Sequence, residues 1–342
     1  MSASTLPSVS VAMPMRNAAA FVAESVRSVL SQATPTYAVQ LVVVDDGSSD
    51  GSADVVRAVL DEQTWPNATC EILTGPCNGI AAALNAAFAA CTGTYLARCD
   101  SDDLFPPGRL ARHAAFLEDP ANAEFVAVCG GFDTVDPKGA LVSRLHEDCE
   151  SEDITDKLRR GDTPTHFGTF LVRRTVVEAL GGARDYFAGT EDVDLQLRIG
   201  TIGRVWFEPD TAYIYRLHHA SSTHTQASPV REFLTEQARK FARQRAEGKP
   251  DDLARGVAEA PPTDDATTPG GKPMDVGEQI QGMLIGRSWK AVAAGQRSES
   301  FRLGWAAIKA RPIHPAGYTN LLKLLILPTL RHKTTAPISS SR

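Results

Sequence analysis

The stretch VQLVVVDDGSSDGSADVVRAVLDEQ, residues 39–63, decides the fold class. Its apolar run is typical of a strand that is buried on both faces. The run ends in two aspartates and a loop of Gly, Ser and Asp, which are the residues of tight turns and helix N-termini. The apolar positions that follow have helical spacing. A buried strand, a polar loop and an amphipathic helix together predict one unit of a parallel α/β sheet.

The same alternation continues through the first 130 residues. We expect further strands at 8–13, 70–75, 93–100 and 124–130, and further helices at 19–32, 78–92 and 107–119. Beyond residue 131 the pattern is mixed, with strands expected at 166–174 and 211–219 and helices at 175–182 and 191–200. The chain is therefore predicted to form a Rossmann-like α/β fold, with a mixed, mainly parallel sheet flanked by helices.

The C-terminal part of the chain differs in composition. A polar helix is expected at 228–247, and the Pro, Asp, Thr and Gly content of 248–275 predicts a flexible linker. Residues 276–342 predict a basic helical extension; from residue 277 onward it has ten Lys and Arg against two acids, a charge of +8 in a chain of −6 overall. Its segment YTNLLKLLILPTLRHK, residues 318–333, fits either an interfacial membrane helix or an arm packed on the α/β domain.

Composition also excludes several classes of protein. A hydrophobic content of 43% and a charged content of 22% exclude global disorder. The absence of a signal-like N-terminus and of a long apolar run predicts a cytoplasmic protein, with peripheral contact at the inner membrane face through the basic extension. The acidic body, without an RNA-binding motif, predicts no nucleic-acid partner. Six cysteines without a CxxC pair predict reduced thiols.

A second strand, in YLARCDSDDLFPPGRL (residues 95–110), ends in three carboxylates, Asp100, Asp102 and Asp103. Like charges this close repel one another, and burial would increase the cost. A divalent cation shared with substrate phosphates would offset the repulsion, whereas the alternative is a solvated acidic turn. Ligands of open α/β sheets bind at the carboxyl ends of strands. We therefore expect this loop and the aspartate loop at 45–50 to line one crevice.

Four stretches, taken together, resemble the family-2 glycosyltransferases with a GT-A fold. They are VSVAMPMRNAAAFVAESVRSVLSQ (9–32), LVVVDDGSSDGS (41–52), NGIAAALNAAFAACTGTYLARCDSDD (78–103) and GTEDVDLQLRIG (189–200). The resemblance covers roughly residues 8–225 and implies a catalytic domain at 1–227, with a nucleotide-binding half (1–130) and an acceptor half (131–227). It implies an inverting transfer from a nucleotide-diphosphate-sugar, with a UDP-sugar favoured, that uses Mn²⁺ or Mg²⁺. The implied acceptor is a hydroxyl of a glycan, a lipid-linked molecule or a protein, in polysaccharide or glycolipid biosynthesis.

The resemblance also assigns site residues. It implies metal binding by Asp102 of the DXD motif and by His218, and catalysis by Asp192 as general base with Glu191 positioning the acceptor. An inverting transfer needs only one base, because the diphosphate leaves with help from the metal. Nucleotide-sugar binding is assigned to Pro14, Asn17, Asp46, Asn78, Asn85, Asp100 and Arg216.

Several residues keep a second interpretation. Asp45, Ser48 and Asp50 also fit turn and capping roles, Thr190 fits a helix cap, and Asp194 with Arg198 fits an ion pair within a helix. His166, in THFGTF (165–170), fits either an acceptor cleft or a packed histidine, and Arg98 precedes the DXD motif where the family is usually more apolar.

Two other functions remain open at this stage. One is a nucleotidyltransferase-like sugar-nucleotide enzyme, although PMRNAAAF (14–21) stands where such an enzyme would carry a Gly-rich, basic phosphate loop. The other is a catalytically inactive adaptor that binds a nucleotide or docks on a membrane.

Overall fold

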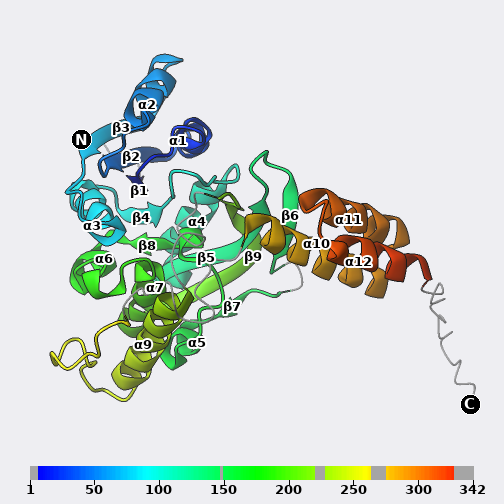
Figure 1. Cartoon of the computed structure of the whole chain (residues 1–342). Coiled ribbons are helices and arrows are strands. Elements are labelled where there is room, and N and C mark those ends of the chain that lie inside the picture. The colour runs from blue at the N-terminus through cyan, green and yellow to red at the C-terminus, as the bar shows by residue number, and fades with distance from the viewer. Residues whose placement is uncertain (1–6, 147–148, 220–227, 263–274, 327–342) are drawn as a thin grey trace, which may run out of the picture. The chain divides into compact units, whose positions relative to one another are not determined.

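The computed structural model describes residues 7–146, 149–219, 228–262 and 275–326 (Figure 1). They divide into two compact units. The larger unit lies within residues 1–216 and 220–273, and the smaller unit lies within residues 217–219 and 274–342.

The larger unit is built on a nine-stranded sheet, counted over its described residues. The strand order is β3-β2-β1-β4-β8-β5-β9-β7, and β6 pairs with β5. The strands are β1 (Ser8–Met15), β2 (Ala38–Asp45), β3 (Ala68–Thr74), β4 (Tyr95–Arg98), β5 (Phe125–Val135), β6 (Leu141–Leu145), β7 (Glu152–Asp153), β8 (Leu171–Arg173) and β9 (Arg204–Arg216). β1 to β4 are parallel, β5 and β9 are parallel to each other, and β8 runs antiparallel to both β4 and β5. The expectation of a mixed, mainly parallel sheet is confirmed.

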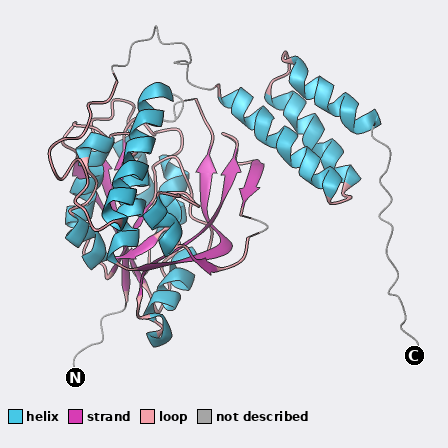
Figure 2. Cartoon of the chain, turned by 90° about the horizontal axis from the view of Figure 1, so that it is seen from below, coloured by secondary structure: helices cyan, strands magenta, loops and turns pink. Residues whose placement is uncertain are grey.

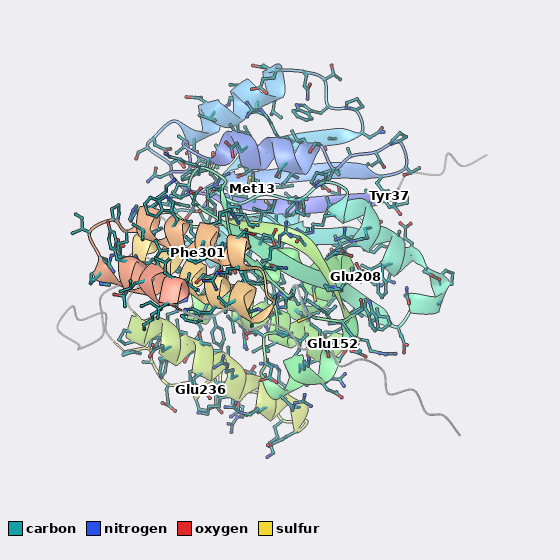
Figure 3. All side chains as sticks on the ribbon, turned by 90° about the vertical axis from the view of Figure 1, so that its right-hand side faces the viewer. Met13, Tyr37, Glu152, Glu208, Glu236 and Phe301 are labelled. Atoms are coloured by element: carbon teal, nitrogen blue, oxygen red, sulfur yellow. The ribbon has the colours of Figure 1, made fainter. Side chains whose placement is uncertain are left out.

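Helices cover both faces of this sheet (Figure 2). One face buries the apolar side chains of α1 (Val22–Leu30), α2 (Ser52–Asp61) and α4 (Arg109–Glu118). The opposite face is covered by α3 (Ile80–Ala90), α5 (Thr155–Arg160), α6 (Arg174–Leu180), α7 (Glu191–Ile202) and α9 (Ser228–Ala246). Because side chains alternate along a strand, β1 contributes Met13 to the first core and Ala12 to the second. Figure 3 shows Met13 at the sheet, whereas Glu236 is exposed on α9.

The elements differ from the sequence-based expectation in several places: β6, β7 and α5 were not expected, and β5 extends beyond residue 130. Residues 166–174 form a strand only in β8; they begin with a 3₁₀ helix, Phe167–Thr169, because the His166 ring accepts the N–H of Gly168 and closes a turn. β9 starts seven residues before the expected 211. Its pairing with β5 shifts register opposite Gly130, and this irregularity accommodates Pro209, which has no N–H for the ladder.

The expected linker at 248–275 is also partly wrong. Asp251, 3% exposed, accepts hydrogen bonds from Arg184 and Arg245, and Asp252 forms an ion pair with Lys240 at 2.9 Å. The described residues 249–262 are therefore fixed within the larger unit by buried carboxylates, which composition alone does not reveal. Residues 263–274 of the expected linker lie outside the described residues.

The smaller unit contains α10 (Val276–Ala293), α11 (Arg297–Ala310) and α12 (Pro315–Ile326), which lie side by side (Figure 2). Gly317 permits the close approach of α12 to α11, since a Cβ there would lie 3.0 Å from the Cα of Ile308. Across the described parts of the chain, every helix is too short or too polar to cross a membrane. Residues 327–342, which include the end of the apolar stretch 318–333, lie outside the described residues.

Candidate active site

The two acidic loops follow β2 and β4, which are both parallel to β1, so they lie at the same edge of the sheet. β1 lies between β2 and β4. The N–H of Asp46 donates to the carbonyl oxygen of Met15, and the N–H of Cys99 donates to the carbonyl oxygen of Ala12. Both loops are thus fixed to the central strand β1, as ligand binding at this edge requires.

Asp46 is held by the strands on both sides of β2. Its carboxylate Oδ1 accepts the N–H of Cys77, which follows β3, at 2.6 Å, and the residue is 4% exposed. A Cβ on Gly75 would lie 2.7 Å from this Oδ1 and 2.8 Å from the Cα of Asp46. Only glycine permits this approach, so the backbone after β3 fixes the orientation of the carboxylate.

The loops that follow β1 and β2 are joined by short polar side chains. Asn17 has a φ of 51°, and its Oδ1 accepts the N–H of Ser49 at 2.9 Å. Asp45 accepts the N–H of Ser48 at 2.9 Å, and Asp50 accepts a backbone N–H of the loop after β1 at 2.9 Å. Asp45, Ser48 and Asp50 therefore have the turn roles that the sequence left open. The contacts of Asn17 are structural and give no support to its assignment to nucleotide-sugar binding.

Three other residues assigned to the nucleotide-sugar differ in their surroundings. Pro14 is buried in β1 beyond the last pair with β4, so its missing N–H costs no sheet hydrogen bond. Asn78 is exposed in the loop between β3 and α3. Asn85 donates to the carbonyl oxygen of Ala183 and accepts its N–H, both at 2.8 Å, so its amide joins α3 to the loop after α6. Both amide groups of Asn85 thus have a backbone partner, and its assignment to nucleotide-sugar binding stays a prediction.

A buried arginine connects the DXD motif to the start of α7. Arg98, 5% exposed, donates from Nε to Asp100 Oδ1 at 2.6 Å and from Nη1 to Glu191 Oε1 at 3.0 Å. Burial lowers the pKa of Arg98, but the carboxylates of Asp100, Glu191 and Asp192 more than offset this and raise it well above its ordinary value. The guanidinium is thus a permanent cation between the two acidic motifs. The backbone N–H of Asp100 also donates to the hydroxyl of buried Tyr213 at 3.0 Å.

Arg216, expected to bind phosphate, is 2% exposed at the end of β9. It donates from Nε to the carbonyl oxygen of Asp102 at 3.0 Å and from Nη2 to Glu24 at 2.6 Å, and its backbone N–H donates to Asp103 Oδ1 at 2.7 Å. These contacts fasten the acidic loop to β9 and α1, and they give no support to a phosphate-binding role. His218 is 7% exposed and groups with the smaller unit, so its role as a metal ligand stays a prediction.

Burial distinguishes the carboxylates of the acidic loop. Asp103 is 1% exposed, and burial, followed by the charges of Asp102 and Asp100, raises its pKa well above the ordinary value. Asp102 is half-buried. In the described part of the chain no three His, Cys, Asp or Glu side chains converge into a metal cage. The donor set fits an ion such as Mg²⁺ or Mn²⁺, which binds through one or two carboxylates and takes its other ligands from phosphate and water.

The two acids at the start of α7 have different surroundings. Glu191 is 2% exposed; its Oε1 accepts from Arg98 and its Oε2 accepts the N–H of Gly189 at 2.9 Å. Burial raises its pKa above the ordinary value, and the charge of Arg98 acts in the opposite direction. The side chain of Asp192 is 19% exposed, and its Oδ2 lies 3.9 Å from Nε2 of His166. Of the pair, Asp192 is therefore the more exposed carboxylate, and its role as general base stays a prediction.

Nearby, the sequence predicted an ion pair correctly and a helix cap incorrectly. Asp194 accepts from Arg198 Nε at 2.8 Å, which confirms the intrahelical pair. Thr190 makes no capping hydrogen bond to α7, because its hydroxyl donates to the carbonyl oxygen of Phe187.

The sequence did not single out Gly75 or Tyr213, and it treated Arg98 only as a departure from the family pattern. A charged residue at the end of a buried strand, directly before an acidic motif, is the signal that could have identified Arg98 as a structural cation. Tyr213 and Gly75 carry no local signal, because their partners lie on other strands.

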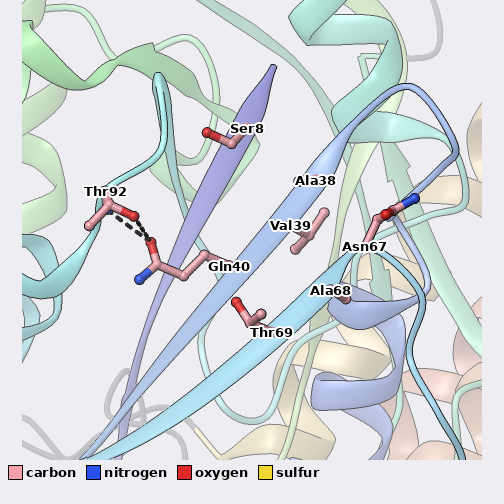
Figure 4. Close-up of a pocket in the computed structure, with 8 residues that line it drawn as sticks. All are labelled: Ser8, Ala38, Val39, Gln40, Asn67, Ala68, Thr69 and Thr92. Atoms are coloured by element: carbon pink, nitrogen blue, oxygen red, sulfur yellow. Dashed lines mark hydrogen bonds between the residues drawn. The ribbon is translucent and has the colours of Figure 1, made fainter. Parts of the chain in front are cut away.

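One pocket of about 400 Å³ lies at the opposite edge of the sheet, where β1, β2 and β3 begin (Figure 4). One of its two amide side chains, Gln40, accepts hydrogen bonds from Ser10 and Thr92 and donates to the carbonyl oxygen of Ala90. These groups satisfy one another, so this pocket is not the candidate site.

Comparison with known proteins identifies the class of protein. The model of the family "Glycosyl transferase family 2" matches residues 10–181, just over half of the chain. The chain therefore belongs to glycosyl transferase family 2, and it is a glycosyltransferase. This decides against the nucleotidyltransferase alternative.

Individual relatives support the same family. The chain is 31% identical over 194 residues to EpsE of Bacillus subtilis (strain 168), named as a glycosyltransferase; the match covers 56% of this chain and 66% of EpsE, just under two thirds. It is 26% identical over 200 residues to the chondroitin synthase of Pasteurella multocida, covering 58% of this chain and 19% of that protein. These relatives are longer than the matched region.

Solved structures support the GT-A fold. S. aureus TarS 1–349 in complex with UDP-GlcNAc matches with a TM-score of 0.55 and 15% identity, covering 93% of this chain and 89% of that one. The mannosyltransferase PcManGT from Pyrobaculum calidifontis, in complex with GDP-Man and Mn²⁺, matches with a TM-score of 0.51 and 21% identity, covering 94% and 80%. At these identities the likeness establishes the fold alone.

Proposed function

We propose that the chain transfers a sugar from a nucleotide-diphosphate-sugar to an acceptor hydroxyl with inversion, and that Asp192 is the general base. The observation that carries this proposal is the contrast at the start of α7. Both oxygens of Glu191 are hydrogen-bonded and the residue is 2% exposed, while the carboxylate of Asp192 is 19% exposed. An inverting transfer needs one carboxylate within reach of the acceptor hydroxyl. Glu191 is then proposed to fix the start of α7 through its hydrogen-bonded ion pair with Arg98.

The donor is proposed to bind at the carboxyl edge of β1, β2 and β4. The fixed carboxylate of Asp46 suits a ring N–H of uracil or guanine, and a UDP-sugar is favoured. Asp102, with Asp100 beside it, is proposed to hold Mg²⁺ or Mn²⁺. Such an ion, when bound, neutralises the charge that develops on the leaving diphosphate. The neighbour with GDP-Man and Mn²⁺ bound supports a divalent metal.

Calorimetry tests the donor site. UDP and GDP are titrated into the protein with and without Mn²⁺, beside Asp102→Ala and the control Asp54→Ala, whose side chain is 83% exposed on α2. We expect metal-dependent binding of one nucleotide that is lost in Asp102→Ala and kept in Asp54→Ala. Binding of neither nucleotide, with or without Mn²⁺, would contradict the donor-site proposal. The anomeric configuration of the product, read by NMR, then tests inversion.

The pathway and the location are proposed from the relatives and from the smaller unit. Relatives include an O-antigen biosynthesis protein of Myxococcus xanthus and a chondroitin synthase of Pasteurella multocida, which supports polysaccharide biosynthesis. The exposed apolar side chains of α12 share one helical face; they are Tyr318, Leu322, Leu325 and Ile326, 51% to 71% exposed. This face, in an extension of charge +8, is proposed to contact an anionic membrane surface.

Vesicle co-sedimentation tests this contact. We expect the protein to bind phosphatidylglycerol vesicles more tightly than phosphatidylcholine vesicles, and Leu322→Ser with Leu325→Ser to weaken the binding. Equal sedimentation of the variant and the wild-type protein would show that α12 does not make the contact.

A further inference from the structure

His166 lies beside Asp192 and is fixed by contacts on its other side. Its Nδ1 accepts the N–H of Gly168 at 3.1 Å, so the proton of the neutral ring is on Nε2, the atom that faces Asp192. The ring stacks on Tyr213 with centroids 5.3 Å apart and an interplanar angle of 30°. A Cβ on Gly168 would lie 2.6 Å from two ring atoms of Tyr213, so this arrangement requires glycine.

Burial, more than the surrounding charges, favours the neutral form of His166. Burial lowers its pKa, and Arg98 and Arg231 act in the same direction, while Asp192 and Asp100 act against them. A neutral imidazole with its proton on Nε2 is a hydrogen-bond donor at working pH.

The distance between His166 Nε2 and Asp192 Oδ2, 3.9 Å, is too long for a direct hydrogen bond. It is short enough for one oxygen atom to lie within hydrogen-bond reach of both groups. Half-buried aromatic rings adjoin this position, since Phe132 and Tyr215 lie 5.8 Å and 5.6 Å from the His166 ring centroid. Ring faces of this kind suit the apolar C–H face of a sugar.

We propose that His166 and Asp192 together bind the reacting hydroxyl of a sugar acceptor, His166 Nε2–H donating to its oxygen and Asp192 Oδ2 accepting its proton. In the transfer, the hydroxyl oxygen forms a bond to the anomeric carbon and the bond from that carbon to the diphosphate oxygen breaks. The hydroxyl proton passes to Asp192, and the bonding electron pair leaves with the nucleoside diphosphate. The inference rests on the proposed function and adds an acceptor-binding residue and an acceptor class to it.

The arrangement also joins the two halves of the site. The Tyr213 ring stacks on the His166 ring, and the Tyr213 hydroxyl accepts the N–H of Asp100. The acceptor group is therefore placed relative to the DXD loop by a single buried side chain, which is 0% exposed.

The experiment measures transfer from the nucleotide-sugar that binds in calorimetry to a panel of p-nitrophenyl pyranosides. His166→Phe keeps the aromatic ring and removes the donor, and His166→Gln restores an N–H at a similar reach. The control is His146→Phe. His146 is half-buried and belongs to the same aromatic cluster, but its ring contacts the carbonyl oxygen of Pro164 and not Asp192. If no pyranoside accepts the sugar, hydrolysis of the donor, with water as acceptor, is measured with the same variants.

We expect His166→Phe to lower kcat/KM for the acceptor about tenfold to hundredfold, with nucleotide affinity within about twofold of the wild-type value. His166→Gln should recover part of the loss, and His146→Phe should leave the acceptor kcat/KM nearly unchanged. The inference is overturned if His166→Phe keeps its acceptor kcat/KM, or if it loses nucleotide binding to the same extent as transfer. A wild-type chain that binds neither UDP nor GDP would overturn the proposed function itself, and this inference with it.

Discussion

Replacing Arg98 with methionine tests the connection between the two acidic motifs most directly. Arg98 and Glu191 are 5% and 3% exposed at the side chain, and their atoms Nη1 and Oε1 lie 3.0 Å apart. Methionine fills a similar volume but leaves Glu191 buried without its cation. Breaking a buried pair in this way costs about 3–5 kcal/mol in the free energy of unfolding. We expect a loss of this size at pH 7.

The pH dependence of this loss follows from Glu191. Burial already raises the pKa of Glu191 in the folded protein, and removal of Arg98 takes away the charge that opposes this. A group whose pKa is raised by folding stabilises the protein below its unfolded pKa, and this contribution is lost as pH rises through the folded pKa. The destabilisation of Arg98→Met should therefore shrink as pH falls from 7 toward 5. Adding Glu191→Gln should recover part of the loss at pH 7.

Urea unfolding measures the effect. Trp289 and Trp305 belong to the smaller unit, so replacing both with phenylalanine leaves Trp65 and Trp206 as fluorescent reporters of the larger one. The control is Arg57→Met, whose side chain is 60% exposed and pairs with Asp54; it should change stability by less than about 0.5 kcal/mol. The reasoning is refuted if Arg98→Met differs from the wild-type protein by less than about 1 kcal/mol at pH 7, or if its destabilisation grows on acidification.

Three further predictions follow from the site and the core. Asp192→Asn should lower transfer by about 10²–10⁴-fold while calorimetry shows unchanged nucleotide affinity; parallel loss of binding would argue against a base. Gly75→Ala should weaken nucleotide binding about tenfold in calorimetry, because its Cβ would displace the Asp46 carboxylate 2.7 Å away. Native protein at pH 8 should react with Ellman's reagent at the exposed Cys77 and Cys149 only, and all six thiols should react after denaturation. Burial raises the pKa of the other four, to about 12 for Cys70 and Cys91 and well above the ordinary value for Cys99 and Cys129.

Much of the fold could be predicted because its signals are local. The apolar run at 39–44 predicts a strand and the residues at 45–51 predict a turn, each from a few neighbouring residues. In the structure, β2 precedes this turn and α2 follows it. The expectation of a strand at 166–174 was wrong at its start, since a single side chain, His166, takes the N–H of Gly168 and closes a turn. The linker interpretation was wrong at 249–262, because Asp251 accepts hydrogen bonds from Arg184 and Arg245, which lie elsewhere in the chain.

The class of the sheet, the motifs and their order can be read from the sequence, because hydrophobic period, turn chemistry and motif spacing are properties of neighbouring residues. The exposure of each predicted site residue and its hydrogen-bond partners follow from the tertiary structure instead. Glu191 and Asp192 are adjacent and chemically alike. Arg98, 93 residues earlier in the chain, is hydrogen-bonded to Glu191, whereas Asp192 is partly exposed. Asn85 likewise looks like a polar ligand in the sequence, but its amide is used by Ala183, 98 residues later. Burial and partner choice depend on contacts across the chain, which no local pattern encodes.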